Sequence, residues 1–202
     1  DIFQTGSGTS TNMNANEVIA NRANELMGFS KGDYHNIHPN NHVNMSQSTN
    51  DTYPTAFRVA LYENLNTLET TMEKLEQAFE LKADEFSQVI KMGRTQLQDA
   101  VPMTLGQEFH TYAIMLQSDI QVLQRTKFDA KKMNLGGTAI GTGINAPPEY
   151  KNIVKEKLAM VTNRDFSTAE DLITATQDTA VFVLISGVLK RIAVKVSKIC
   201  ND

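Results

Sequence analysis

The sequence predicts an all-α protein, built as a long antiparallel helix bundle. Apolar residues recur at steps of three and four along three long stretches, which is the period of a helix that buries one face. No stretch alternates convincingly between apolar and polar residues, as a half-buried strand would. With 202 residues, 41% of them hydrophobic and 21% charged, the chain has the composition of an ordinary soluble protein and can bury a core.

The first long helix is predicted from one apolar stripe. Asp51 and Thr52 are residue types that cap helix N-termini, Pro54 suits a first turn, and Gly93 follows the last apolar position. The stripe consists of Phe57, Leu61, Leu65, Leu68, Met72, Leu75, Phe79, Ala83, Phe86 and Ile90.

Two further long helices are predicted in the same way. One should begin at Thr104, because Thr104 and Gln107 have the spacing of a capping box, and should end before Gly136. Its stripe is Leu105, Phe109, Tyr112, Leu116, Ile120 and Leu123. The other should run from Thr179 to the chain end on Phe182, Ile185, Leu189, Ile192, Val196 and Ile199.

Shorter helices are expected near residues 15–27 and 149–161. The first long helix is roughly 50 Å long, whereas a compact globule of this chain length is about 40 to 45 Å across. An elongated bundle that completes its burial against other subunits resolves this mismatch, so we expect a homo-oligomer. The chain lacks an initial methionine, and a helical pattern still runs at Asp202, which indicates an internal piece of a longer protein.

Charge and composition exclude several classes of partner. The net charge is −4 and the basic residues are dispersed, so we expect no nucleic-acid partner. No window approaches ~18 uninterrupted apolar residues, so we expect no membrane partner. The single cysteine, Cys200, cannot form an intramolecular disulfide, which fits a cytoplasmic location.

Four polar segments rich in Gly, Ser, Thr and Asn separate the predicted helices. Each leads towards a helix start, where unpaired N–H groups and the positive end of the helix dipole favour an anion. The segments are 5–16, 35–52, 93–104 and 136–148.

The first segment, GSGTSTNMNANE, places Ser7, Thr9 and Thr11 among glycines and asparagines just before a helix. These side chains could form a neutral, donor-rich cradle for a carboxylate or phosphate. The same spacing also fits a flexible turn followed by a helix cap.

The second segment, HNIHPNNHVNMSQSTND, holds more asparagine, serine and threonine than one turn needs. Ser48, Thr49 and Asn50 directly precede the longest helix, where hydroxyls, an amide and N–H groups could converge on one anion. Alternatively, Ser48 to Asp51 only cap the helix. We reject a zinc site at its histidines, because no cysteine lies nearby and the spacing gives no regular ligand face. A Ser-His-Asp triad lacks its usual strand-turn-helix context.

The third segment, KMGRTQLQDAVPMTLGQE, joins two long helices. In one interpretation Arg94 and Asp99 pair to stabilise the connection, which leaves Thr95 and Gln96 able to face a ligand. The fourth, NLGGTAIGTGINAPPEY, is either a structured loop that approaches substrate or a tight connection.

Taken together and in this order, the four segments resemble those of the fumarase and aspartase superfamily. The resemblance covers essentially the whole chain but less than half of a typical subunit of that family. It implies a three-domain helical subunit of the fumarase/aspartase type, here a partial subunit, with residues 1–52 ending the N-terminal domain and 53–202 beginning the central bundle. It also implies a homotetramer whose active sites combine residues of three subunits.

Within the superfamily, the chain most resembles the aspartases, through KGDY at 31–34, QSTND at 47–51 and KMGRTQLQDAVP at 91–102. Fumarases typically carry histidine at the position of Gln96, whereas aspartases carry histidine or glutamine. Glutamine cannot carry a proton near neutral pH, which argues against hydration of fumarate in the fumarase manner.

The resemblance assigns substrate contacts to Thr9, Ser48, Thr49, Asn50, Thr95 and Gln96, with Ser7 a weaker candidate. It places a possible secondary anion site at His38 and Asn40. The implied substrates are L-aspartate and fumarate, with no cofactor and no metal. The family's catalytic base is a serine on a later Gly-Ser-Ser loop, so no catalytic residue is expected within residues 1–202, and this piece alone should be inactive.

Two other interpretations remain open from the sequence. One is a fumarase acting on malate and fumarate. The other is a non-catalytic helical module whose fold is sustained by contacts within an oligomer.

Overall fold

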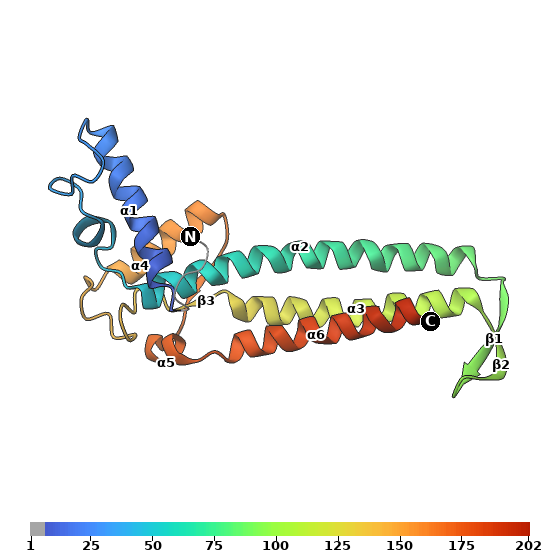
Figure 1. Cartoon of the computed structure of the whole chain (residues 1–202). Helices are drawn as coiled ribbons and strands as arrows, with labels where there is room; N and C mark the ends of the chain where they lie inside the picture. The colour runs from blue at the N-terminus through green and yellow to red at the C-terminus, as the bar shows by residue number, and fades with distance from the viewer. Residues whose placement is uncertain (1–6) are drawn as a thin grey trace. The chain divides into compact units, whose positions relative to one another are not determined.

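A computed structural model describes residues 7–202 of the chain (Figure 1). The chain divides into two compact units, one formed by residues 7–61 and 130–179 and the other by residues 62–129 and 180–202. The predicted domain boundary after residue 52 concerns the full-length subunit and stays a prediction.

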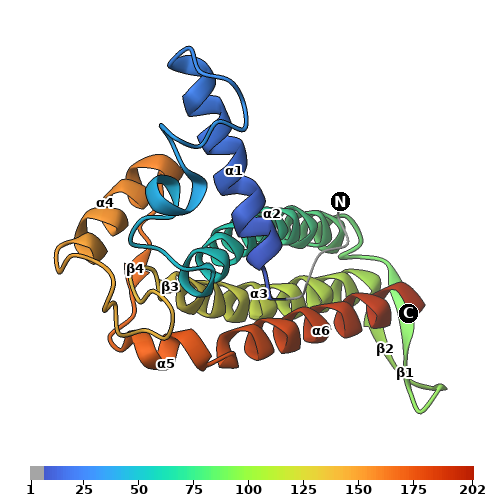
Figure 2. The ribbon, with the colours of Figure 1, turned by 60° about the vertical axis from the view of Figure 1, so that its left-hand side comes forward.

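The first unit holds the shorter elements. Its helices are α1 (Thr9–Leu26), a π-helix η1 (Pro39–Val43), the beginning of α2 (Thr49–Glu85), α4 (Tyr150–Thr162) and α5 (Leu172–Gln177). Two very short strands, β3 (Lys132–Met133) and β4 (Ser167–Thr168), pair in parallel. The N-terminal end of α1 lies against the start of α2 (Figures 1 and 2).

The second unit is an antiparallel bundle. It consists of the rest of α2, a hairpin of β1 (Ile90–Thr95) and β2 (Gln98–Thr104), and the helices α3 (Leu105–Ala130) and α6 (Ala180–Asn201). In Figure 1, α3 runs opposite to α2, and α6 runs opposite to α3. Both the all-α fold class and the antiparallel bundle are therefore confirmed.

Each unit has its own buried core. In the first unit the most buried apolar side chains are Ala20, Ala130, Met133, Leu135 and Phe166. In the bundle they are Leu65, Met72, Ala83, Tyr112, Ala113, Leu116, Ile120, Leu123, Ile185, Val188 and Ile192. Of the predicted stripe on α2, only part is buried within this chain, since Phe57 is 49% and Leu75 is 38% exposed.

Polar contacts set how the bundle helices align. The buried carboxylate of Asp119 on α3 accepts from Arg191 at 2.6 Å and from Lys195 at 2.8 Å, both on α6. Further along α3, Lys127 pairs with Glu69 of α2. No helix among residues 7–202 is long and apolar enough to cross a bilayer.

The predicted capping box forms as expected. The backbone N–H of Thr104 donates to Gln107 Oε1 at 2.9 Å, and the N–H of Gln107 donates to Thr104 Oγ1 at 3.1 Å. The helices predicted from Thr179 onward and near 149–161 are confirmed as α6 and α4.

Three expectations were wrong in detail. Segment 93–104 is not a plain loop, because β1 and β2 pair across it, with a bulge between Met92 and Arg94. Its strands are largely exposed, so they lack the alternating pattern that reveals half-buried strands. The second error is the end of the first long helix, which was expected to continue to Ile90. In the structure α2 ends at Glu85, and Ile90 is the first residue of β1.

The third error concerns α1, which begins at Thr9, well before residue 15. Its first turns are rich in Ser, Thr and Asn, which are weak helix formers. Tertiary hydrogen bonds compensate, since buried Asn16 donates to Asn44 Oδ1 at 3.0 Å and buried Asn24 donates to the carbonyl of Ile37 at 3.0 Å.

Candidate functional site

The N-terminal turns of α1 and α2 meet in the first unit. Asn12 of α1 donates to Thr49 Oγ1 at 3.0 Å and accepts from Thr52 Oγ1 at 3.2 Å. Gly8, the N-cap of α1, lies over the ring of Tyr53, where an added Cβ would come within 2.5 Å of the ring. Only glycine fits there, which also suits its φ of 83°.

This meeting brings four predicted contact residues to one place. Thr9 opens α1, Ser48 precedes α2, and Thr49 and Asn50 form the first turn of α2. The N-cap residue of α1 is Gly8, which has no side chain that could accept from the N–H groups of the first turn. Two positive helix ends lined by uncharged donors suit a carboxylate.

Ser48 and Asp51 form a reciprocal cap at the start of α2. The N–H of Asn50 donates to Ser48 Oγ at 3.2 Å, and the N–H of Ser48 donates to Asp51 Oδ1 at 2.9 Å. Ser48 and Asp51 therefore do cap the helix, and the assignment of this turn to a substrate stays a prediction. Among the described residues, the hydroxyl oxygens of Ser48 and Thr49 act as acceptors, which leaves their O–H groups for a ligand.

The glycine-rich segment packs directly onto this cap. The second oxygen of Asp51 accepts from the N–H groups of Gly136 at 3.2 Å and Thr138 at 2.9 Å. Asn50 Nδ2 donates to the carbonyl of Ala139 at 2.7 Å. Of the two interpretations of segment 136–148, the geometry favours a structured loop beside the predicted contact residues.

Asp51 itself is completely buried. Burial raises the pKa of this carboxyl above its usual value, and the hydrogen bonds from the N–H groups of Ser48, Thr138, Gly136 and Thr52 oppose that rise. The sequence identified Asp51 only as a helix cap, because its partners in segment 136–148 are remote along the chain.

Thr95 and Gln96 belong to the second unit, at the tip of the hairpin. Thr95 pairs with Gln98, so Gln96 and Leu97 alone form the turn, with φ values of 51° and 64°. Turns of this kind favour Asn-Gly, and two larger residues there are strained. Strain held at a tip that carries predicted contact residues is typical of a functional turn.

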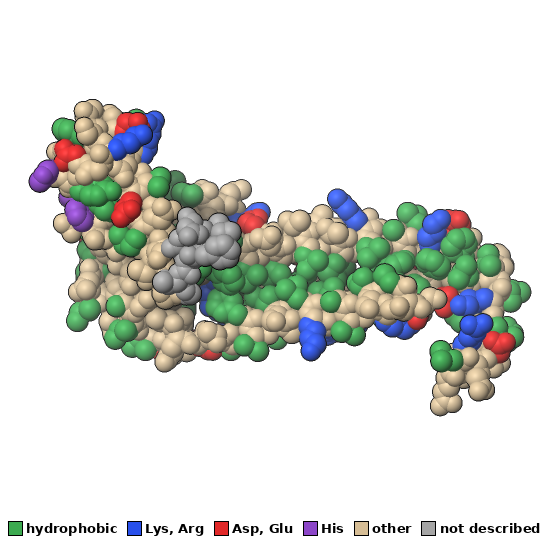
Figure 3. All heavy atoms as spheres, viewed as in Figure 1, with side chains coloured by type: hydrophobic (Ala, Val, Ile, Leu, Met, Phe, Trp, Pro, Cys, Tyr) green, Lys and Arg blue, Asp and Glu red, His purple; other side chains and the backbone are tan. Residues whose placement is uncertain are grey.

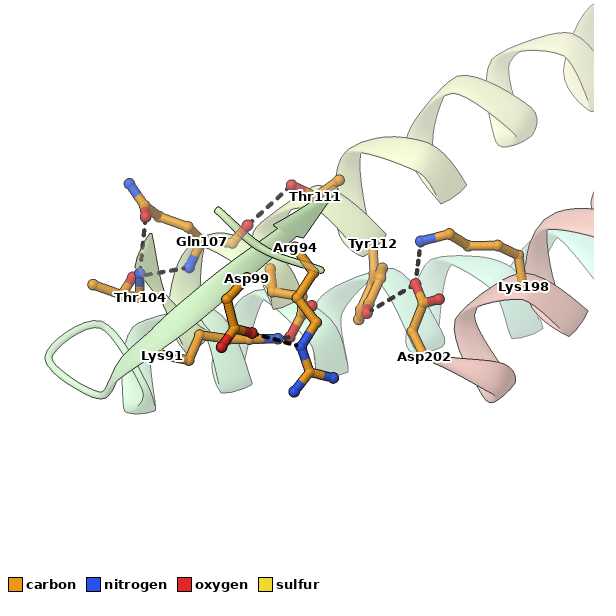
Figure 4. Close-up of polar contacts among 10 residues, drawn as sticks. Lys91, Arg94, Asp99, Thr104, Gln107, Thr111, Tyr112, Lys198 and Asp202 are labelled. Carbon is orange, nitrogen blue, oxygen red and sulfur yellow. Dashed lines mark hydrogen bonds and ion pairs between the residues drawn. The ribbon is translucent and has the colours of Figure 1, made fainter. Parts of the chain in front are cut away.

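A polar cavity of about 740 Å³ lies beside the hairpin. It is lined by Lys91, Met92, Gly93, Arg94, Gln96, Leu97, Met103, Glu108, Lys198, Asn201 and Asp202. Arg94 pairs with Asp99 at 3.2 Å, which confirms the predicted ion pair (Figure 4). Figure 4 also shows Asp202 between Tyr112 and Lys198.

The buried phenol of Tyr112 donates to Asp202 at 3.3 Å. Burial, together with the nearby charges of Glu108 and Asp202, raises the pKa of Tyr112 to about 12. Lys91 neutralises Glu108 at 2.6 Å. The charges around the cavity are thus largely paired within the bundle.

His38 and Asn40, the predicted secondary anion site, lie at the start of η1. His38 Nδ1 accepts from the N–H groups of Asn40 at 3.0 Å and Asn41 at 3.3 Å, and His42 Nδ1 accepts from the N–H of His38 at 2.8 Å. Both rings therefore cap this short helix, and the anion site stays a prediction. Within residues 7–202 no three His, Cys, Asp or Glu side chains gather as metal ligands.

Comparison with known proteins places the chain among lyases. The whole chain, residues 1–202, matches the family model described as "Lyase". Curated aspartate ammonia-lyases from Helicobacter pylori and Pseudomonas aeruginosa are 59% identical to it, and that from Escherichia coli is 55% identical. These alignments cover 100% of the chain but 42–43% of the relatives, so the chain spans less than half of their length.

Solved structures are similar over the same range. A structure described as fumarate lyase:delta crystallin from Brucella melitensis matches with a TM-score of 0.97 and 54% identity, over 100% of this chain and 44% of that one. A class II fumarase from Schistosoma mansoni matches with a TM-score of 0.94 and 34% identity, over 100% of this chain and 45% of that one.

Proposed function

This chain belongs to the lyase family, and on that premise we propose that the full-length protein reversibly deaminates L-aspartate to fumarate and ammonia. The observation that carries the proposal is its identity of 55–59% to aspartate ammonia-lyases over all 202 residues. The fumarase among the similar structures is 34% identical, which makes fumarate hydration the second candidate.

The geometry of the first unit supports this chemistry. Removing a proton from the carbon next to a carboxylate creates an enolate-like dianion, so the site must present donors where that charge accumulates. The hydroxyls of Thr9, Ser48 and Thr49, with the N–H groups at two helix starts, are donors of this kind. We assign them to the substrate carboxylates.

Asn50, Thr95 and Gln96 complete the proposed contact set. The amide of Asn50 already donates to Ala139, so its role is both to hold the glycine-rich loop and to face the substrate. Thr95 and Gln96 are exposed at the strained hairpin tip and supply one hydroxyl and one amide. The catalytic base is proposed to come from outside residues 1–202.

We further propose that the full-length protein is a cytoplasmic homotetramer that shares its active sites between subunits. Apolar side chains remain on the surface along the bundle of the second unit (Figure 3). On α6, Val183 is 70% and Val194 is 61% exposed. Exposed apolar patches of this kind favour burial against another subunit. The single cysteine fits a reducing compartment.

The test compares L-aspartate with L-malate as substrates of the purified full-length protein. Formation of fumarate is followed by its absorbance, and the reverse reaction is followed with and without ammonia. We expect strong preference for aspartate and an ammonia-dependent loss of fumarate. Efficient turnover of malate would instead favour the fumarase candidate.

Gln96→His examines the residue that separates the two candidates. If Gln96 contacts the substrate, this change should alter kcat/KM for aspartate severalfold and add a titrating group to the pH profile. Leu97→Met, at the neighbouring exposed position of the same turn, serves as the control. An unchanged rate and pH profile would assign Gln96 to the turn alone.

A further inference from the structure

The buried carboxylate of Asp51 divides its two oxygens between two distant segments. Oδ1 accepts from the N–H of Ser48, and Oδ2 accepts from the N–H groups of Gly136 and Thr138, which lie 85 and 87 residues further along. Few side chains could serve both segments, since this role needs two acceptor oxygens and no competing donor.

A helix cap alone does not require this arrangement. The start of α3 is capped by the neutral pair Thr104 and Gln107, of which Thr104 is half-buried and Gln107 exposed. Asp171 caps α5 by accepting from the N–H groups of Ile173 and Thr174, and there the carboxylate is exposed. Burying a carboxylate costs free energy that an exposed cap avoids, so Asp51 does more than cap.

A second set of contacts joins the same two segments. Buried Asn134 donates from Nδ2 to the carbonyl of Asn50 at 2.9 Å and to Thr176 Oγ1 at 3.1 Å. Asn50 in turn donates from its side chain to the carbonyl of Ala139. Residues 48–51 and 134–139 are therefore linked in both directions by hydrogen bonds from main chain and side chains.

We propose that Asp51 is a positioning residue, which holds the donors of Ser48, Thr49 and Asn50 in register with the glycine-rich loop 136–139 so that they meet a substrate carboxylate together. This inference rests on the proposed function for its substrate, but the coupling of the two segments is a property of the fold. The raised pKa of this carboxyl is in keeping with the cost of holding it there.

Asp51→Asn in the full-length protein tests the proposal. The amide oxygen can replace only one carboxylate oxygen, and the new NH₂ group then faces N–H groups of Ser48 or of Gly136 and Thr138. Because the affected donors meet a carboxylate that is present in the bound substrate as well as in the transition state, KM for L-aspartate should rise roughly 10-fold, in addition to any fall in kcat. A purely stabilising role would lower the fraction of active enzyme, and hence kcat, at unchanged KM.

Asp171→Asn is the matched control, because it makes the same substitution at an exposed helix cap and should leave KM and kcat within about twofold. If Asp51→Asn fails to fold, KM for L-aspartate is measured in Asp51→Glu instead. Glutamate retains both the charge and the helix cap, but its extra methylene displaces the oxygen that binds Gly136 and Thr138. An unchanged KM in the folded variant would overturn the proposal.

Amide hydrogen exchange separates this inference from the proposed function. Exchange at Ser48, Gly136 or Thr138 should accelerate at least about 10-fold in Asp51→Asn and stay unchanged in Asp171→Asn, whatever the substrate is. If the unmodified protein does not turn over aspartate, the proposed function is wrong. The exchange rates then still test whether Asp51 couples residues 48–51 to residues 136–139. Unchanged exchange at all three amides would show that Asp51 does not couple the segments.

Discussion

Thr95 is the residue whose proposed role is easiest to isolate. It is exposed at the end of β1 and pairs with Gln98 only through the hairpin ladder. Thr95→Ala should therefore leave the fold intact while removing one hydroxyl donor from a charged transition state. We expect kcat/KM for aspartate in the full-length protein to fall roughly 10- to 1,000-fold.

Thr95→Ser provides the matched control, because it keeps the hydroxyl and removes only a methyl group. It should retain most of the activity. If Thr95→Ala stays within about twofold of the unmodified enzyme, Thr95 belongs to the hairpin and makes no substrate contact.

At the scale of a secondary-structure element, the hairpin carries strain that can be released. Leu97 is 96% exposed and has a φ of 64°, which glycine adopts without steric cost. Leu97→Gly should stabilise the hairpin by about 1 kcal/mol, measured by exchange of the β1 and β2 amides. Val101→Gly, on an exposed strand position with ordinary φ, should loosen the hairpin by about 0.5 to 1 kcal/mol.

Slower exchange in Leu97→Gly combined with weaker activity would indicate that the strained turn serves the site. Faster exchange would mean that the Leu97 side chain contributes to holding the hairpin despite its exposure.

One buried carboxylate contributes to the contact of α3 with α6. Asp119 is fully buried and faces both Arg191 and Lys195. Asp119→Ala should lower the free energy of unfolding by about 2 kcal/mol, less than for a fully buried pair, because both cations reach solvent. Chemical denaturation measures this change.

Glu25→Ala offers the comparison, since Glu25 pairs with Arg22 and Lys31 on the surface. Exposed pairs of this kind contribute little to stability, because solvent screens them, so the loss in Glu25→Ala should be clearly smaller than in Asp119→Ala. Equal losses in the two variants would argue that Asp119 has no special part in aligning α6.

At the scale of the whole molecule, the proposed sharing of active sites between subunits can be tested by mixing two inactive variants and measuring whether their hybrid oligomers regain activity. Ser48 belongs to the first unit and Thr95 to the second. If one site takes Ser48 and Thr95 from different subunits, hybrids of Ser48→Ala and Thr95→Ala proteins regain unmodified sites. With equal, random mixing, about a quarter of the sites should be restored.

Each variant alone, treated in the same way, sets the baseline for that measurement. Hybrids with no activity above this baseline would mean that each site draws both residues from one subunit. If the mass of the unmodified protein in solution differs from four times the mass of one subunit, the proposed homotetramer is contradicted.

Local signals in the sequence were sufficient for the main elements. The apolar period of α2, α3 and α6 and the pair of Thr104 and Gln107 involve residues a few positions apart, so they can be read without knowing the fold. The four polar segments were likewise visible, and the described residues of three of them are joined by hydrogen bonds in the first unit. The exposed hairpin was missed because its strands bury neither face.

The sequence by itself determined the helical class, the position of the long helices, the donor-rich segments and the resemblance to lyases, because each depends on residue type and short spacing. Only the tertiary structure decided that Gly8 must pass over Tyr53 and that Asp51 and Asn134 join segment 48–51 to segment 134–139. Those contacts connect residues as many as 87 positions apart, and a pairing at that separation leaves no period or local spacing in a single chain.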